Sequence, residues 1–179
     1  MDNYCNVFCF KQDTLILTEN GYKKIQDLTN NDNIQTYTNG FKKLDILGQR
    51  YIFNFPDGTR HCNQLFVYKK GVYPELFEDL YITGKHSILI DELTPEQEIE
   101  IPKVIWRIEI TDGKYLLPCC IDPNAEPYGV KSRIPIHHIV LENDDDNCNY
   151  GIYANGILTE SCSKFNFIEY SQMVIINNR

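Results

Sequence analysis

The chain has no long hydrophobic run and few basic residues, and each shortage excludes a class of function. No apolar stretch approaches the roughly 20 residues that a membrane-spanning helix needs. The first residues carry neither the basic start nor the apolar stretch of a secretory signal peptide. With 17 Lys and Arg against 25 Asp and Glu, the net charge is -8, which repels a nucleic-acid backbone on average. We therefore expect a soluble domain that neither spans a membrane nor binds nucleic acid as its main task.

The size and composition fit one globular domain. A chain of 179 residues leaves little room for a second domain. A hydrophobic fraction of 42% and a charged fraction of 23% are typical of folded chains rather than disordered ones. We expect this domain to be a monomer.

The seven cysteines do not form the pattern of a disulfide framework. Their number is odd, two of them are adjacent (Cys119 and Cys120), and no Cys-x-x-Cys occurs. Zinc ligands could be drawn from His61, Cys62, His137 and His138. These four residues do not fall at a recognised ligand spacing. We therefore expect reduced thiols, no metal and no cofactor, in a reducing compartment such as the cytoplasm.

The apolar residues follow a strand pattern. Short runs of β-branched and aromatic residues alternate with turn signals such as Asn20-Gly21, whose glycine accepts a positive φ. No segment offers four turns of clean helical periodicity. The predicted strands are residues 14–18, 33–37, 44–53, 64–69, 80–83, 87–90, 103–111, 115–117, 137–142 and 151–153. The predicted fold class is all-β.

Three segments interrupt this pattern. Residues 95–100 are short and acidic and are the best helical candidate. Four prolines between residues 117 and 136 predict an irregular connection there. The acidic run at residues 142–147 is predicted to be a solvated loop.

Three sequence blocks, in this order, resemble those of a self-processing family. The first is CFKQDT at residues 9–14, followed by Gly21, Ile25, Leu28 and Asp32. The second is LYITGKHSIL at residues 80–89, with a Thr-x-x-His pattern, and the third is YGIYANGIL at residues 150–158. Together they resemble the Hint family, which comprises inteins and hedgehog-type autoprocessing domains. One departure is Asn31, which stands where a glycine usually precedes the aspartate matched by Asp32.

The resemblance covers most of the chain and implies its organisation. It implies a Hint-type horseshoe of antiparallel strands, which agrees with the strand-rich pattern found independently. Residues 1–8 are then an N-terminal flanking segment, residues 9–162 the Hint domain, and residues 163–179 a C-terminal tail. The partner implied is a polypeptide attached covalently upstream.

The family chemistry would begin at the Phe8–Cys9 peptide bond. The Cys9 thiol attacks the carbonyl of Phe8 through a five-membered ring, and this N–S acyl shift gives a thioester. At a free pKa of about 8.5, only a few per cent of a thiol is ionised near neutrality, so a base or proton relay helps. His86 can protonate the departing Cys9 nitrogen, because imidazole titrates near working pH. The resemblance implies that Thr83 hydrogen-bonds the scissile amide and polarises or twists it.

The resemblance also implies residues for the later steps. His138 lies in the strand before the third block, where inteins often place a polar residue. Cys162 matches the place of the first downstream nucleophile and can accept the Phe8 acyl group. His137 alternates to the other face of its strand and is expected to be structural.

The end of the third block departs from inteins. Glu160-Ser161-Cys162 stands where inteins usually have His-Asn before the nucleophile. Serine cannot form the succinimide and glutamate is a poor substitute for the histidine, so full splicing is not expected. Hedgehog-type domains pass the acyl group to a sterol, but residues 163–179 are short for the region they use, and Gln49 lies near the place of their acidic residue. We therefore expect water to be the acceptor, with cleavage between Phe8 and Cys9 and no turnover on other substrates.

Other interpretations of these residues stay open. An isolated cysteine is more often a small buried hydrophobe, and an isolated histidine is more often a satisfied, half-buried one. The alternatives are acyl transfer to Cys162 and a noncatalytic Hint-like module that binds a protein partner. A cysteine hydrolase acting on other molecules would need an open substrate cleft.

Overall fold

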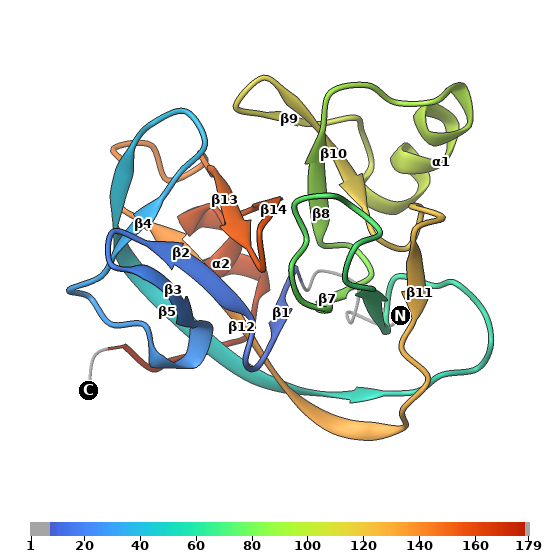
Figure 1. The fold of residues 1–179 in the computed structure, drawn as a ribbon, viewed down its shortest axis with the longest axis horizontal. Helices are drawn as coiled ribbons and strands as arrows, with labels where there is room; N and C mark the ends of the chain where they lie inside the picture. The colour runs from blue at the N-terminus through green and yellow to red at the C-terminus, as the bar shows by residue number, and fades with distance from the viewer. Residues whose placement is uncertain (1–7, 178–179) are drawn as a thin grey trace.

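The computed structural model describes residues 8–177, and its strands form one continuous, strongly bent antiparallel sheet (Figure 1). The predicted all-β fold of antiparallel strands is confirmed. The strands are β1 (Phe10–Lys11), β2 (Leu15–Thr18), β3 (Gly21–Lys24), β4 (Asn33–Gln35), β5 (Phe41–Asn54), β6 (Leu65–Tyr68), β7 (Leu80–Thr83), β8 (Ser87–Ile90), β9 (Ile110–Thr111), β10 (Lys114–Pro118), β11 (Ala125–Pro127), β12 (Ser132–Leu141), β13 (Gly151–Ala154), β14 (Ile157–Glu160) and β15 (Val174–Ile175). The helices are the 3-10 helix η1 (Ile25–Asp27), α1 (Pro95–Ile105) and α2 (Lys164–Tyr170).

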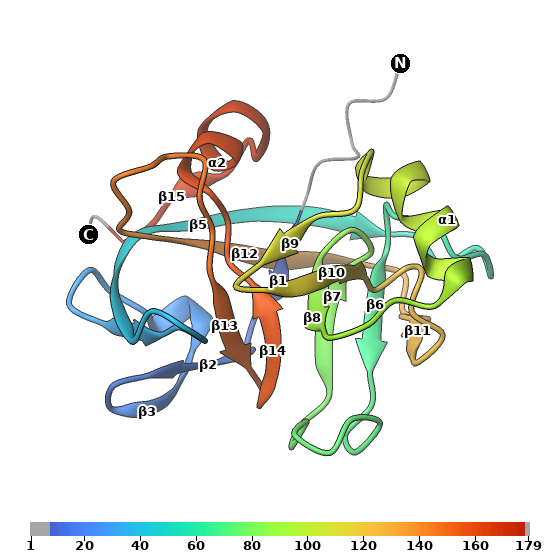
Figure 2. The same ribbon diagram turned by 90° about the horizontal axis from the view of Figure 1, so that it is seen from above.

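A long two-stranded ribbon supports the rest of the sheet. Strands β5 and β12 pair from Ser132–Asn54 at one end to Leu141–Leu44 at the other, and they run side by side across the molecule (Figure 2). The short strand β1 lies between β12 and β7, where Phe10 is opposite both His137 and Ile82. The start of the chain is thereby inserted into the middle of the sheet.

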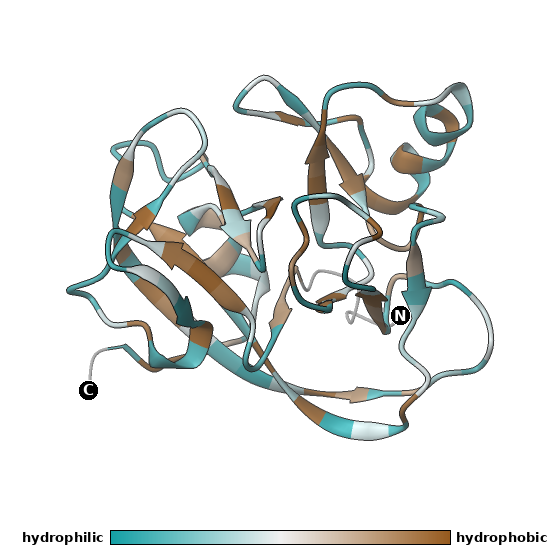
Figure 3. Ribbon diagram, viewed as in Figure 1, coloured by the Kyte–Doolittle hydropathy of each residue, from teal (hydrophilic) through white to brown (hydrophobic). Residues whose placement is uncertain are grey.

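The inner strands bury one continuous apolar cluster. Its largest fully buried side chains include Phe10, Phe66 and Tyr68, which come from β1 and β6. Figure 3 shows hydrophobic residues along the inner strands and hydrophilic residues in the connecting loops. Because burying each large apolar side chain contributes about 1.5–3 kcal/mol, this cluster stabilises the strands around Phe10 strongly.

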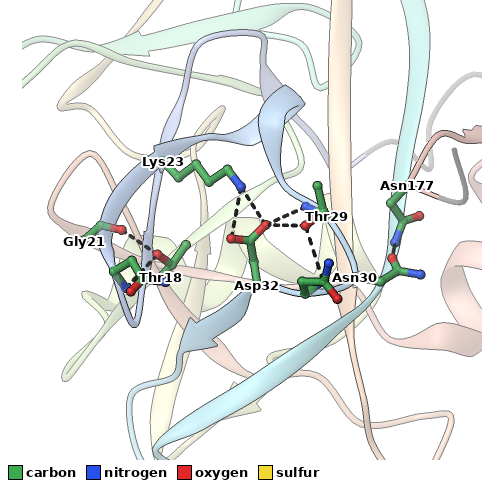
Figure 4. A network of polar contacts seen from close by, with 9 residues as sticks. Thr18, Gly21, Lys23, Thr29, Asn30, Asp32 and Asn177 are labelled. Atoms are coloured by element: carbon green, nitrogen blue, oxygen red, sulfur yellow. Dashed lines mark hydrogen bonds and ion pairs between the residues drawn. The ribbon is translucent and has the colours of Figure 1, made fainter.

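A polar network closes the loop after η1 (Figure 4). The Asp32 carboxylate accepts hydrogen bonds from Lys23 Nζ at 2.8 Å and from Thr29 N at 2.7 Å. Burial alone would raise the pKa of Asp32, but these donors outweigh it and hold that pKa below its usual value. In the same region, Asn177 donates to the side chain of Asn30 and ties this loop to the C-terminal segment.

The strand predicted at residues 103–111 is wrong. Helix α1 continues to Ile105, and only Ile110–Thr111 is extended. The Thr94 hydroxyl accepts from Gln97 N and the Gln97 side chain from Thr94 N, so a capping box starts the helix. Ile101 and Ile105, four residues apart, then bury one face of it. The helix ends at Trp106, whose φ of 72° is left-handed.

The irregular connection predicted at residues 117–136 is correct only in part. Strand β11 pairs with β6, and β12 begins at Ser132 and contains Pro135. Pairing of β12 with β1 ends at Ile136, and the Pro135 carbonyl accepts only from the loop residue Gln12. A proline fits there because the missing N–H would face the end of β1 rather than a neighbouring strand.

The residues after Cys162 pack onto the sheet. Ser163 caps α2, Phe167 of α2 is buried, and β15 pairs with β5. Gly48 on β5 leaves the space that this packing needs, because a Cβ there would lie 2.3 Å from Cε2 of Phe167 and 2.9 Å from Sδ of Met173. None of the helices in the described residues is long and apolar enough to cross a membrane.

We expect Gly48→Ala to lower the free energy of unfolding by about 1–3 kcal/mol, because overpacking forces the Phe167 ring out of place. Urea denaturation of the two proteins measures this difference. Gly129→Ala is the matched control, since a Cβ at Gly129 meets no atom within 4 Å. Equal losses in the two variants would contradict this account of how α2 docks.

Candidate active site around Cys9

The Phe8–Cys9 peptide bond lies against the end of β7. Cys9 N donates to the hydroxyl of Thr83 at 2.9 Å, and Thr83 N donates to the Cys9 carbonyl at 3.0 Å. Pairing of Phe10 with Ile82 places these neighbours opposite each other. The register of two short strands thus holds the Cys9 amide nitrogen on the threonine hydroxyl.

A tight turn after β7 returns the chain toward the same bond. His86 N donates to the Thr83 carbonyl at 2.8 Å, which closes the turn over three residues. At Gly84 a Cβ would lie 2.7 Å from the backbone of Cys62, so only glycine fits this close approach. The Thr-x-x-His spacing is therefore the spacing of this turn.

The His86 ring is buried beside Cys9 and is held in one tautomer. Its Nε2 lies 3.1 Å from the Glu160 carbonyl, which can only accept, so Nε2 carries the hydrogen. Its Nδ1 has no hydrogen-bond partner among residues 8–177, and the ring packs 4.2 Å from that of Phe10. Burial lowers the pKa of His86 to about 3, although the neighbouring backbone groups of Glu160 and of Cys9 oppose this. The ring is therefore neutral, with a lone pair on Nδ1.

A second segment braces this turn. Cys119 N donates to the His86 carbonyl at 3.0 Å, and Cys119 Sγ donates to the Thr83 carbonyl at 3.2 Å. Arg60 in turn donates to the carbonyls of Cys119 and Cys120, at 3.1 and 3.2 Å. These contacts could not be predicted from the sequence, because no local sequence pattern links Arg60 to a cysteine pair 59 residues away.

His138 and Cys162 lie on the other side of His86. The His138 ring is buried 5.5 Å from that of His86, and neither of its nitrogens has a partner in the described part of the chain. Burial, with a smaller contribution from His86, lowers the pKa of His138 well below its usual value. Cys162 N donates to the Ile139 carbonyl at 2.9 Å, which attaches this cysteine to β12.

Burial raises the pKa of both thiols of the site, and Cys162 adds to the shift at Cys9. Burial, and then the neighbouring Cys162, raise the pKa of the Cys9 thiol well above its usual value, while Arg50 opposes them. Burial, and then Glu160, raise the pKa of the Cys162 thiol. Both side chains are therefore thiols rather than thiolates at neutral pH.

The remaining candidates from the sequence lie elsewhere. His137 lies next to His138 on β12, but its Nε2 is 3.2 Å from the side-chain nitrogen of Gln49. His61 lies 3.6 Å from Asp57. In the described residues no three His, Cys, Asp or Glu side chains gather closely enough to hold a metal ion.

A cleft of about 500 Å³ opens beside Phe8. Phe8, His138, Glu160 and Cys162 all contribute to its wall. Trp106, which follows α1 and is 87% exposed, and residues of α2 line it as well. The cleft therefore gives small molecules access to the surroundings of Phe8.

Glu160 has more contacts in the site than its sequence position suggested. Its Oε1 accepts from Ser87 N at 2.9 Å, and its carbonyl fixes the tautomer of His86. Burial raises the pKa of its carboxyl to about 8, although hydrogen bonding to Ser87 opposes the shift. The sequence signal was its place two residues before Cys162.

Comparisons with known proteins concern the family and the fold. A family model described as the Hint domain matches residues 8–165 of the chain. The solution structure of a bacterial intein-like domain from Clostridium thermocellum has a TM-score of 0.51 at 11% identity, and the match covers 87% of this chain and 99% of that one. The crystal structure of the gp41-1 intein has a TM-score of 0.46 at 15% identity, covering 84% and 96%. At these identities the structural likeness concerns the fold alone.

A curated relative matches a shorter part of the chain. An uncharacterized protein of Methanocaldococcus jannaschii is 29% identical over 80 residues. Those residues are 45% of this chain and 9% of that protein. The chain thus matches a small part of the length of this relative.

We expect the free energy of unfolding to fall as the pH drops from 6.5 to 5. His86, His137 and His138 have lowered pKa values in the folded state, about 3 for His86 and about 4 for His137, so the unfolded chain binds more protons in this range. Glu160 works in the opposite sense, because its pKa is raised to about 8. The net uptake approaches about two protons, or about 2–3 kcal/mol per pH unit near pH 5.

Urea denaturation at a series of pH values measures this slope. His137→Gln is expected to reduce the slope of the free energy of unfolding against pH by the contribution of one proton, about 1.4 kcal/mol per pH unit at most. A free energy of unfolding that stays constant between pH 5 and 6.5 would contradict the burial of neutral histidines.

Proposed function

The chain belongs to the Hint-domain family, and we propose that it cleaves the peptide bond between Phe8 and Cys9 through a thioester. A Hint fold with its intein-like neighbours supports self-processing in general. The hydrogen bond from Cys9 N to Thr83 Oγ1, on the turn that carries His86, is the observation that carries the specific proposal. The substrate is a polypeptide attached upstream, and each molecule acts once, on itself.

In the first step the Cys9 sulfur attacks the Phe8 carbonyl carbon. The raised pKa of the buried thiol excludes a preformed thiolate at neutral pH, so the proton must leave during the attack. The lone pair on Nδ1 of the neutral His86 ring is a suitable acceptor, and the ring contacts the Cys9 backbone. His86 therefore takes the thiol proton as a general base.

The same proton then completes the step. Protonated His86 is unstable in its buried site, because burial lowers its pKa to about 3, and it is a strong acid there. It passes the proton to Cys9 N as the bond from that nitrogen to the Phe8 carbonyl breaks. Thr83 holds the nitrogen during the transfer. The products of this step are a thioester on Cys9 and a free amine.

Water resolves the thioester in the second step. The cleft beside Phe8 admits a small nucleophile, and His138 lies on its wall. We propose that His138 assists this later step by hydrogen-bonding the incoming water, since both of its ring nitrogens lack partners in the described residues. Hydrolysis leaves a carboxylate on Phe8 and a thiol on Cys9.

A second candidate for the acceptor is Cys162. Its thiol is near enough to that of Cys9 to raise the Cys9 pKa, and it contributes to the wall of the same cleft. Transfer of the acyl group to Cys162 would give a branched thioester. Cys162→Ala separates the two acceptors, because it abolishes the branched species and leaves hydrolysis intact.

We expect a fusion with a tag before Met1 to release the tag, and hydroxylamine to accelerate the release. Cys9→Ala removes the nucleophile and is expected to abolish both reactions. Cys148→Ala, which removes an exposed thiol, is the matched control and is expected to cleave like the parent. Mass spectrometry of the released fragment identifies Phe8 as its last residue. An intact fusion with and without hydroxylamine would instead favour a noncatalytic module.

We expect Thr83→Val to slow hydroxylamine-triggered cleavage by about 10- to 100-fold. It removes the acceptor of the Cys9 N–H at nearly constant volume, which costs about 1.5–3 kcal/mol. Thr83→Ser keeps a hydroxyl and is the control, with urea midpoints to show that both variants fold. Equal rates in the two variants would contradict the role of the hydroxyl.

A further inference from the structure

Resolution of the thioester needs a base at the cleft, and the described residues offer few. Glu109 is on the wall, but its side chain is 40% exposed and paired with Arg107 at 2.9 Å. His138 is on the wall too, but its ring has the task proposed above of hydrogen-bonding the water. Glu160 is the remaining carboxyl on this wall that is buried.

Glu160 is held in place from two sides. The backbone N–H of Ser87 donates to its Oε1 at 2.9 Å, and its own carbonyl accepts from His86. It shares the cleft wall with Phe8 and is near enough to Cys162 to raise the pKa of that thiol. Glu160 thus lines the same cleft as Phe8, and its carboxyl is held in a fixed position.

We propose that Glu160 is the general base that activates the water attacking the thioester, an inference that rests on the function proposed above. The Glu160 carboxylate takes a proton from the water as its oxygen bonds to the Phe8 carbonyl carbon. The carbon–sulfur bond then breaks, and the Cys9 sulfur leaves with the proton returned by the carboxyl. The step consumes one water and restores the carboxylate.

The backbone carbonyl and the side-chain carboxyl of Glu160 have separate tasks in this mechanism. The Glu160 carbonyl fixes His86 for the first step, and its carboxyl serves the second. A carboxyl with a pKa near 8 is a far stronger base than an ordinary glutamate, which suits proton removal from water. Substitution of the side chain alone should therefore affect the two steps unequally.

The test uses Glu160→Gln in the full chain with an upstream tag. Glutamine keeps an oxygen for the Ser87 N–H but cannot take the proton. Hydroxylamine-triggered cleavage reports thioester formation and is expected to stay within about twofold of the parent. Spontaneous hydrolysis at pH 8.5 is expected to slow by about 100-fold. Glu169→Gln, on an exposed position of α2 outside the cleft wall, is the matched control and is expected to change neither rate.

The pH profile supplies a second readout. Hydrolysis in the parent should level off above pH 8 as Glu160 ionises, whereas in Glu160→Gln the residual rate should keep rising with hydroxide. Equal spontaneous rates and profiles in the two proteins would overturn the role of Glu160 but leave thioester formation standing. Equal losses of both reactions in Glu160→Gln would show a structural role only and would also overturn it. A parent without Cys9-dependent cleavage by hydroxylamine would instead overturn the proposed function itself.

Discussion

The pairing of β1 with β7 is the constraint on which the site depends. One residue pair, Phe10 and Ile82, sets the register, and the next pair then exchanges two hydrogen bonds across the strand ends. A slip of one residue would turn Cys9 toward the opposite face of the sheet. The long β5–β12 ribbon opposes such a slip, because β12 pairs with Phe10 on the edge of β1 that faces away from β7.

Burial governs the electrostatics around that register. The thiols and imidazoles of the site are all desolvated, so each is driven toward its neutral form. Neutral thiols and imidazoles can pass a proton over a short distance without holding a net charge between transfers. Because these groups are neutral, proton transfer depends on how each ring and carbonyl is oriented. The Glu160 carbonyl sets the orientation of the His86 ring.

The sequence predicted the strands and the three blocks well because their signals are local. Short apolar runs indicated β7 and β8, and Thr-x-x-His indicated the turn between them. The capping box that starts α1 is also a local signal. The β-branched residues near the end of this helix favour a strand, and this preference gave the wrong prediction there. The brace from Arg60 and Cys119 could not be predicted, because it joins segments that only the folded sheet brings together.

Insertion of β1 between two neighbours has a consequence for the cleaved form that we propose. Cutting the chain at Cys9 creates an α-amino group at the hydroxyl of Thr83, between two buried residues. An amine of this kind ordinarily gains a proton near pH 8, and an ammonium ion is poorly tolerated in such surroundings. Protonation would draw the new chain end out toward solvent and loosen the two-residue strand β1. The severed ends would then no longer face each other, which makes religation unfavourable.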